Sequence, residues 1–132
     1  MTGYVTNLEK LSLNNDTFRT VLFTAHYCQV VVMSLKPGEE IGKEVHGVDQ
    51  FIRIEKGSGT AFLDGKEEHI EEGFAVVVPA GTEHNIVNGG TSGAMKLYTV
   101  YAAPDHKDGI VHETNKDAEQ DQPFDGHVSI GA

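Results

Sequence analysis

GFAVVVPAGTEHNIVN, residues 73–88, is the most informative stretch of the chain. Its β-branched run ends at Pro79, which predicts a strand over 74–78, because proline lacks the amide N–H that a continuing strand needs. Pro79 and Gly81 then predict a turn. His84 and Ile86 follow on one side of the next predicted strand, since alternate residues of a strand share a face. The stretch therefore presents a histidine directly after a turn between two strands.

Five residues of this stretch stand at the spacing of a known motif. Gly73, Pro79, Gly81, His84 and Asn88 match the second sequence motif of the cupin superfamily. That motif reads glycine, five residues, Pro-x-Gly, two residues, histidine, three residues and asparagine. Every specified position is filled, so the resemblance is specific.

The frame from Gly38 to Gly57 resembles the first cupin motif with two departures. Glu44 stands where the family usually has its first histidine, His46 fills the second histidine position, and Gln50 replaces the usual glutamate. In cupins these positions and the histidine of the second motif hold a divalent metal inside a small antiparallel barrel. The resemblance therefore implies a metal site formed by Glu44, His46, Gln50 and His84.

Short β-branched or aromatic runs dominate the middle of the chain. They predict strands over 18–24, 29–35, 60–63, 66–70, 74–78 and 95–102. Asp64-Gly65 predicts a tight type I′ hairpin, because both positions tolerate positive φ. Many short strands with glycine-rich turns are typical of a sandwich or barrel. Together with the resemblance, this predicts an all-β double-stranded β-helix, or jelly-roll barrel, of the cupin type.

The 132 residues are enough for one barrel and too few for two. We predict an N-terminal segment over 1–17, a cupin barrel over 18–103 and a C-terminal tail over 104–132. The tail loses the β-branched runs and is expected to be mostly irregular, with a short helix within 113–122. It either packs on the barrel or is mobile.

Composition limits the partners. The chain has 20 acidic and 10 basic residues and a net charge of −10, which repels nucleic-acid phosphates and anionic membrane surfaces. Its single cysteine excludes an internal disulfide and suits a reducing compartment. No apolar run approaches the ~20 residues of a membrane span, and no signal-peptide pattern is present. We expect a cytoplasmic protein that acts on a small molecule.

We also expect a homodimer, because cupins usually cover exposed sheet edges with a second subunit. The strand over 18–24 would contribute to the interface.

Strand parity supports a common inward face for the predicted ligands. Glu44 and His46 are two residues apart, and Gln50 has the parity of the apolar Ile52 and Ile54. One carboxylate, two imidazoles and one amide oxygen suit Zn²⁺, Mn²⁺, Fe²⁺ or Ni²⁺ rather than a thiolate-seeking metal. Glu44 also has two other interpretations, a solvated charge at the barrel mouth or a catalytic base beside the metal. Gln50 has one, as a hydrogen-bond acceptor for His46.

The remaining histidines divide into two groups. His26, His69 and His127 lie in turns or among acidic residues and are expected to be solvated. His106 and His112 follow the last predicted strand, where a tail that folds back over the barrel mouth would bring them to the site.

The chain is similar to small one-domain cupins labelled sugar-phosphate isomerase-like, after mannose-6-phosphate isomerases. This resemblance implies a metal-dependent enzyme acting on a small sugar or carbonyl compound by isomerase- or lyase-type proton transfer, with Glu44 or a tail histidine moving the proton. A metal-dependent dioxygenase is one alternative. A non-catalytic barrel that binds a small molecule is another, favoured by the two replaced ligands. The oxygen donor retained at both replaced positions favours an enzyme.

Overall fold

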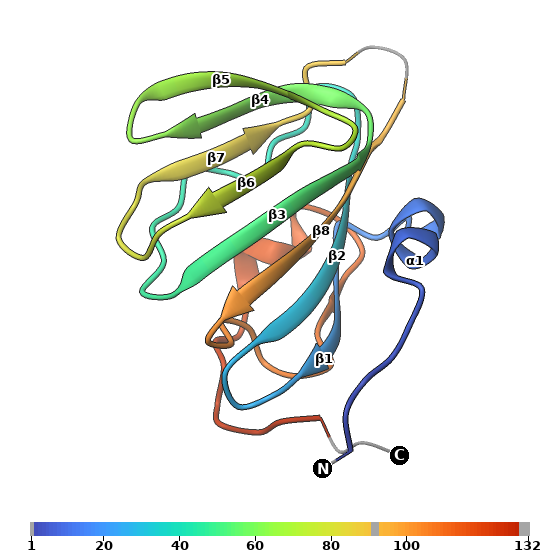
Figure 1. Ribbon diagram of the computed structural model, residues 1–132, viewed down its shortest axis with the longest axis vertical. Helices are drawn as coiled ribbons and strands as arrows, with labels where there is room; N and C mark the ends of the chain where they lie inside the picture. The colour runs from blue at the N-terminus through green and yellow to red at the C-terminus, as the bar shows by residue number, and fades with distance from the viewer. Residues whose placement is uncertain (1, 91–92, 130–132) are drawn as a thin grey trace.

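The computed structural model describes residues 2–90 and 93–129 and contains two antiparallel sheets (Figure 1). Met1 and residues 130–132 of the predicted terminal segments, and residues 91–92 of the predicted barrel, lie outside the described residues. The elements in chain order are α1 (Leu8–Asn14), β1 (Arg19–Thr24), β2 (Gln29–Leu35), β3 (Asp49–Lys56), β4 (Ser58–Leu63), β5 (Lys66–Glu71), β6 (Ala75–Val78), β7 (His84–Val87), β8 (Met95–Ala102), β9 (Val111–His112) and the 3₁₀ helix η1 (Asp117–Gln120).

The larger sheet has six strands in the order β6-β3-β8-β2-β1-β9, and the smaller has three in the order β5-β4-β7. The segment over 38–46 continues the smaller sheet along the free edge of β7 through single bridges, Glu40 to Val87 and Glu44 to His84. This segment carries two of the predicted metal ligands, so it matters to the site although it forms no regular strand.

The all-β prediction is confirmed, and several strands were predicted to the residue. The expected strands over 29–35 and 95–102 coincide with β2 and β8. Asp64 and Gly65 have φ of 48° and 82°, as the type I′ hairpin between β4 and β5 requires.

Two short helices differ from expectation. The helix α1 was not predicted; the side chain of Asn7 caps it by accepting a hydrogen bond from the backbone N–H of Lys10. The helix expected within 113–122 is reduced to the four-residue η1. Asp117 accepts a hydrogen bond from the backbone N–H of Thr114, and such local side-chain bonds favour a turn over a longer helix.

The core lies between the inner faces of the two sheets. Val31, Met33 and Leu35 of β2 and Ile52 and Ile54 of β3 are fully buried. Burying such a side chain stabilises the fold by roughly 1.5–3 kcal/mol. Alternation along β3 also directs Gln50 to this inner face, where it is 4% exposed.

The last residue of the second motif, Asn88, has a structural role. It is buried, and its side-chain N–H₂ donates to the carbonyl oxygens of Leu35 and Gly93, while its oxygen accepts the N–H of Gly90. The asparagine thereby satisfies buried backbone groups where β2 and β7 end. It fixes the far end of the strand that begins at His84.

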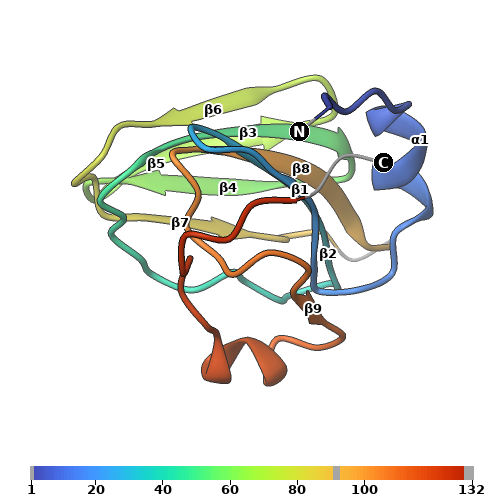
Figure 2. The ribbon, with the colours of Figure 1, turned by 90° about the horizontal axis from the view of Figure 1, so that it is seen from below.

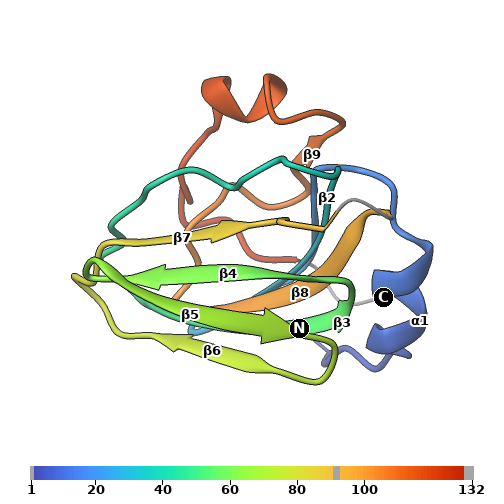
Figure 3. The ribbon, with the colours of Figure 1, turned by 90° about the horizontal axis from the view of Figure 1, so that it is seen from above.

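The tail from Pro104 onward packs on the barrel. β9 extends the six-stranded sheet by pairing with β1, and Arg19 lies opposite His112. Figures 2 and 3 show the tail, in orange and red, on the side of the molecule opposite β6. None of the helices in the described part of the chain is long and apolar enough to cross a membrane.

Candidate metal centre

Glu44 and His84 face one another across the edge of the smaller sheet. The backbone N–H of each donates to the carbonyl oxygen of the other, at 2.9 Å in both directions. The N–H of Gly81 donates to the carbonyl oxygen of His46 at 2.8 Å. The Pro79-x-Gly81 turn is therefore fastened to the strand segment that carries His46, and the two sequence motifs meet here.

A bulge at Gly42 directs Glu44 inward. The N–H of Ile41 donates to the carbonyl oxygen of Ile86 and Glu44 pairs with His84, so Gly42 and Lys43 on one side lie opposite the single residue Asn85 on the other. The extra residue is accommodated at Gly42, whose φ of 112° favours glycine, and the side-chain oxygen of Asn85 accepts its N–H. Because of the bulge, Ile41 contacts the core while Glu44 still reaches the inner cluster.

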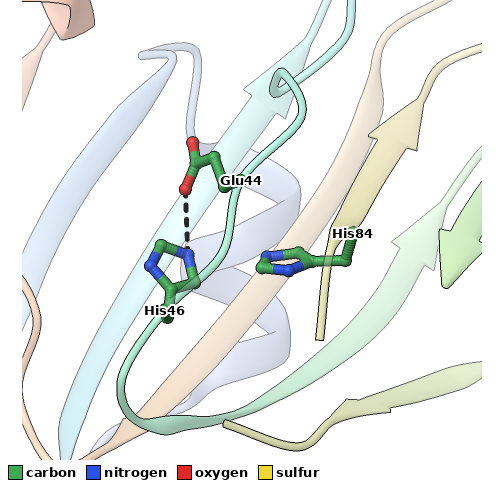
Figure 4. A group of neighbouring side chains, drawn as sticks. All are labelled: Glu44, His46 and His84. Carbon is green, nitrogen blue, oxygen red and sulfur yellow. Dashed lines mark ion pairs between the residues drawn. The ribbon is translucent and has the colours of Figure 1, made fainter. Parts of the chain in front are cut away.

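Glu44, His46 and His84 bring one ligand atom each to a common point. These atoms all lie within 4.8 Å of one another, with His84 buried and the other two half-buried. Figure 4 shows the ion pair between the Glu44 carboxylate and the His46 ring, with the His84 ring beside the His46 ring. This spacing suits one divalent cation.

The partners of the two histidines favour tautomers that leave a lone pair for the cluster. His84 Nδ1 lies 2.9 Å from the carbonyl oxygen of Thr82, which can only accept, so Nδ1 carries the proton and Nε2 is free. His46 Nδ1 lies 3.3 Å from Asp105 Oδ2, and a carboxylate there likewise favours the proton on Nδ1. Metal-binding histidines are oriented by such partners.

His46 Nε2 and Glu44 Oε2 are close without forming a well-directed hydrogen bond. They lie 2.9 Å apart, yet the buried Nε2 has no hydrogen-bond partner of acceptable geometry. Two donor atoms bound to one ion at about 2.1 Å and at right angles would be roughly 3.0 Å apart. A separation of 2.9 Å suits an N–H···O bond and two ligands of one ion equally well, so it is the poor alignment at Nε2 that favours the two ligands.

The pKa values of Glu44 and His46 shift in opposite directions. Burial would raise the pKa of Glu44, but the adjacent His46, with Arg19 and His84, holds it below its ordinary value. Burial would lower the pKa of His46, but the carboxylates of Glu44 and Asp105 raise it above its ordinary value. The arrangement stabilises positive charge between the carboxylates, which is also the requirement for a bound cation.

Gln50 lies on the same inward face, and its side-chain oxygen is available as a metal ligand. Its Nε2 donates to Thr99 Oγ1 at 2.9 Å, and its buried Oε1 has no partner. In the strand register Gln50 lies opposite Tyr101, whose ring contacts the His46 ring edge-on. The alternative in which Gln50 accepts a hydrogen bond from His46 is not formed in this structure. An amide oxygen with no partner suits a fourth ligand.

A cavity of about 370 Å³ opens beside the cluster and is closed partly by the tail. Its lining includes Glu44 and His46 from the barrel and Asp105, His106 and Asp121 from the tail. Gln29, fully buried in β2, holds the tail in place. Its Oε1 accepts the N–H groups of Asp105 and His106, and its Nε2 donates to the carbonyl oxygen of His106.

Some cavity residues were left open or missed by the sequence analysis. His26, His69 and His127 are exposed, as predicted, whereas His106 and His112 are buried. Arg19, Asp105 and Asp121 were not considered as site residues. For Arg19 the sequence held a signal, since it shares the parity of Val21 in a predicted strand; for the two aspartates it held none.

Comparison with known proteins identifies relatives. A family model described as "Cupin domain" matches residues 31–101. The chain is 45% identical to the uncharacterized protein YrkC of Bacillus subtilis (strain 168) over 122 residues, which cover 87% of this chain and 65% of YrkC. It is 44% identical to the uncharacterized protein L612 of Acanthamoeba polyphaga mimivirus, over 82% of this chain and 70% of that protein.

Among solved structures, BH2720 from Bacillus halodurans superposes with a TM-score of 0.87 at 38% identity, covering 89% of this chain and 94% of BH2720. The match with YrkC spans just under two thirds of that protein's length. None of these three names specifies a reaction or a ligand.

Proposed function

This chain belongs to the cupin family, and we propose that it is a metal-dependent enzyme that moves a proton on a small sugar or carbonyl compound, in isomerase- or lyase-type chemistry. The proposed ligands are Glu44, His46 and His84, with Gln50 as a fourth. Their nitrogen and oxygen donors suit Zn²⁺, Mn²⁺, Fe²⁺ or Ni²⁺.

One observation carries the proposal. His46 Nε2 belongs to a cluster whose ligand atoms converge within 4.8 Å, and neither it nor the buried Gln50 Oε1 has a hydrogen-bond partner among the described residues. Buried polar atoms are normally satisfied, and a bound ion would satisfy both. The adjoining cavity, at about 370 Å³, lies in the size range of small-molecule sites.

A divalent ion held there would polarise a carbonyl oxygen of the substrate. The chain's own groups then have distinct tasks. Asp105 faces His46 Nδ1 and orients the ring, while the Thr82 carbonyl oxygen does the same for His84. Gln29 keeps Asp105 in place by accepting its backbone N–H.

One group lining the cavity is placed to move the proton: Glu44, an ionised carboxylate whose pKa is held below its ordinary value. The tail histidine of the cavity, His106, has both ring nitrogens engaged and orients its neighbours instead. Its Nδ1 lies 2.7 Å from Asp121 Oδ2, so the ring proton sits there, and its Nε2 lies 3.2 Å from the hydroxyl of Tyr101. Burial raises the pKa of Tyr101, so its hydroxyl stays protonated and donates to His106 Nε2.

The proposal is tested by measuring metal content and proton transfer on the same preparation. Protein purified without added metal should contain close to one first-row transition metal per chain. Incubated in D₂O with a panel of aldoses, ketoses and hydroxy ketones, it should introduce deuterium at the carbon next to the carbonyl, and chelation should stop this. Oxygen consumption without deuterium exchange would indicate the dioxygenase alternative. Metal and ligand binding without either reaction would indicate a non-catalytic binding protein.

We also propose a homodimer built on the outer face of the six-stranded sheet. A row of apolar residues crosses five strands of this face in register: Val77, Phe51, Val100, Val30 and Phe23. Val77 is 62% exposed, and Tyr4 stacks on Phe23 at 4.9 Å. Unpartnered apolar rows of this kind mark interaction surfaces.

Light scattering should give twice the chain mass of 14.3 kDa. Phe51→Lys, inside the row between Val77 and Val100, should give a monomer of 14.3 kDa. Val45→Lys changes another exposed apolar residue outside the row and should leave the dimer intact. A parent protein of monomer mass at micromolar concentration would refute the dimer.

A further inference from the structure

Arg19 is a buried cation without an ion-pair partner. It begins β1, faces the interior opposite Met33, and is 3% exposed. Among the residues that the structure describes, no carboxylate lies within ion-pair distance of its guanidinium, and Glu44 and Asp121 interact with its charge only at longer range. Arginine is almost never this buried unless an anion compensates the lost hydration, because an isolated charge is costly in a protein interior.

The guanidinium is oriented by a neutral group. Arg19 Nη1 lies 3.2 Å from His112 Nδ1, and since arginine only donates, the imidazole must accept with a lone pair. Burial is the main cause that lowers the pKa of His112 below its ordinary value, and the positive charge of Arg19 is the second. Both favour a neutral ring. His112 Nε2 in turn faces Asp121 Oδ1 at 3.6 Å. The histidine therefore fixes the guanidinium without neutralising it.

The guanidinium reaches the cavity lining, and one of its N–H groups has no partner among the residues that the structure describes. Its buried Nε has no hydrogen-bond partner, although it always carries a proton. The Phe18 ring lies 5.4 Å from Arg19 Cζ, and an aromatic ring leaves the in-plane N–H groups unsatisfied. An unpaired, preoriented guanidinium is a suitable receptor for a planar oxyanion.

Arg19 lines the same 370 Å³ cavity as Glu44 and His46. The other charged side chains of the lining are Lys43 and the carboxylates Asp105, Glu119 and Asp121. Together with Glu44, the cavity has four carboxylates and only two cations, Arg19 and Lys43. This excess of negative charge disfavours a doubly charged phosphate there. A singly charged group held directly by Arg19 meets less repulsion.

We propose that this cavity binds a small organic carboxylate, whose carboxylate group accepts hydrogen bonds from the guanidinium of Arg19 while the remainder of the molecule reaches the Glu44, His46 and His84 cluster. The second half of this statement rests on the proposed function. The Arg19 contact does not, since it requires no metal. The substrate class would then be a hydroxy or keto acid rather than a neutral sugar.

The test compares lactate with 1,2-propanediol, in which CH₂OH replaces the carboxylate, and with inorganic phosphate. Calorimetry should show lactate binding the parent at least about tenfold more tightly than either of the other two. Arg19→Met should abolish this preference, and Arg19→Lys should weaken lactate binding by several fold because lysine lacks the planar fork. Lys43→Met removes an exposed cation from the same cavity and should change binding less than about twofold.

Metal content is measured on every sample, and each titration is repeated on chelated protein. If the parent holds no metal, the proposed function fails, while the lactate preference of the chelated protein still tests Arg19. Equal binding of lactate and propanediol, tighter binding of phosphate, or unchanged lactate binding by Arg19→Met would each overturn the carboxylate site. Circular dichroism checks folding. If Arg19→Met does not fold, the test rests on lactate binding by Arg19→Lys. Lactate affinity equal to that of the parent in this variant overturns the proposal.

Discussion

The barrel mouth contains two clusters of identical composition, each with two histidines and one carboxylate. The first consists of Glu44, His46 and His84; the second consists of His106, His112 and Asp121. In the first, the ligand atoms converge within 4.8 Å, and His46 Nε2 has no hydrogen-bond partner. In the second, both nitrogens of His106 and Nδ1 of His112 are within hydrogen-bond distance of a polar group, and His112 Nε2 lies 3.6 Å from Asp121. The partners are Asp121 and Tyr101 for His106, and Arg19 and Asp121 for His112.

The difference shows that the direction of lone pairs, rather than residue type, distinguishes a metal site from a positioning network. In the first cluster the outer nitrogens face Thr82 and Asp105, so the inner nitrogens are available. In the second, Asp121 accepts a hydrogen bond from His106 Nδ1–H, and Arg19 donates to the lone pair of His112 Nδ1. The second cluster therefore orients Arg19 and the tail.

The largest expected effect is on metal content. His84→Ala should reduce metal affinity by more than the roughly 10–100-fold loss typical of an outer partner, because it removes a direct imidazole ligand. Elemental analysis after dialysis measures the retained metal. His106→Ala is the matched control from the second cluster and should retain parental metal. If both variants keep the metal of the parent, the first cluster does not hold it.

Glu44→Gln should come next, since it keeps the shape of the side chain and removes the negative charge that stabilises the ion. We expect metal retention to fall about tenfold or more while the barrel remains folded. Glu44→His, which restores the residue usual in the family, should keep the metal and shift preference toward Zn²⁺ and Ni²⁺. If Glu44→Gln instead keeps full metal and loses only proton transfer, Glu44 is a base and not a ligand.

Gln50→Leu should have a smaller effect than either change, because an amide oxygen is a weaker donor than an imidazole or a carboxylate. A few-fold loss in a chelator competition assay is expected. Leucine has a similar volume, so the inner face around Thr99 should stay packed. A loss as large as that of His84→Ala would make Gln50 an equal partner in the first cluster.

Asp121→Asn should leave metal content unchanged and lower the free energy of unfolding by about 1–3 kcal/mol at neutral pH, since it weakens the charged hydrogen bond to His106. Burial would raise the pKa of Asp121, but His106, Arg19 and His112 lower it below its ordinary value of 3.8. Its contribution to stability is therefore present above pH 3.8 and lost as pH falls through the folded-state pKa.

Urea denaturation of parent and Asp121→Asn should accordingly differ at about pH 6 and converge as the pH falls below about 4. A difference that persists at the lower pH would mean that Asp121 acts through packing rather than charge. Loss of metal in this variant would contradict the separation of the two clusters.

The sequence determined the barrel and the two histidines of the first cluster. Strands over 29–35 and 95–102, the Asp64-Gly65 turn and the inward parity of Gln50 follow from period-two patterning and turn chemistry, which act over a few residues. His84 and His46 were found because each stands in a motif of fixed spacing. The location of both in the structure agrees with that pattern.

Only the tertiary structure decided the second cluster, the role of Asp105 and the burial of Arg19. Arg19 and His112 are 93 residues apart, and the tail that carries Asp105 and His106 is held by one buried amide, Gln29. The local sequence of the tail does not predict that it packs against Gln29 and Arg19, because its polar residues would suit a solvent-exposed segment equally well. The bulge at Gly42 was not predictable from local pattern either. It lets Ile41 and Glu44, three residues apart, both point inward, although strict alternation would place them on opposite faces. Local patterns set which strands form, but long-range packing sets which lone pairs and charges are left to meet a ligand.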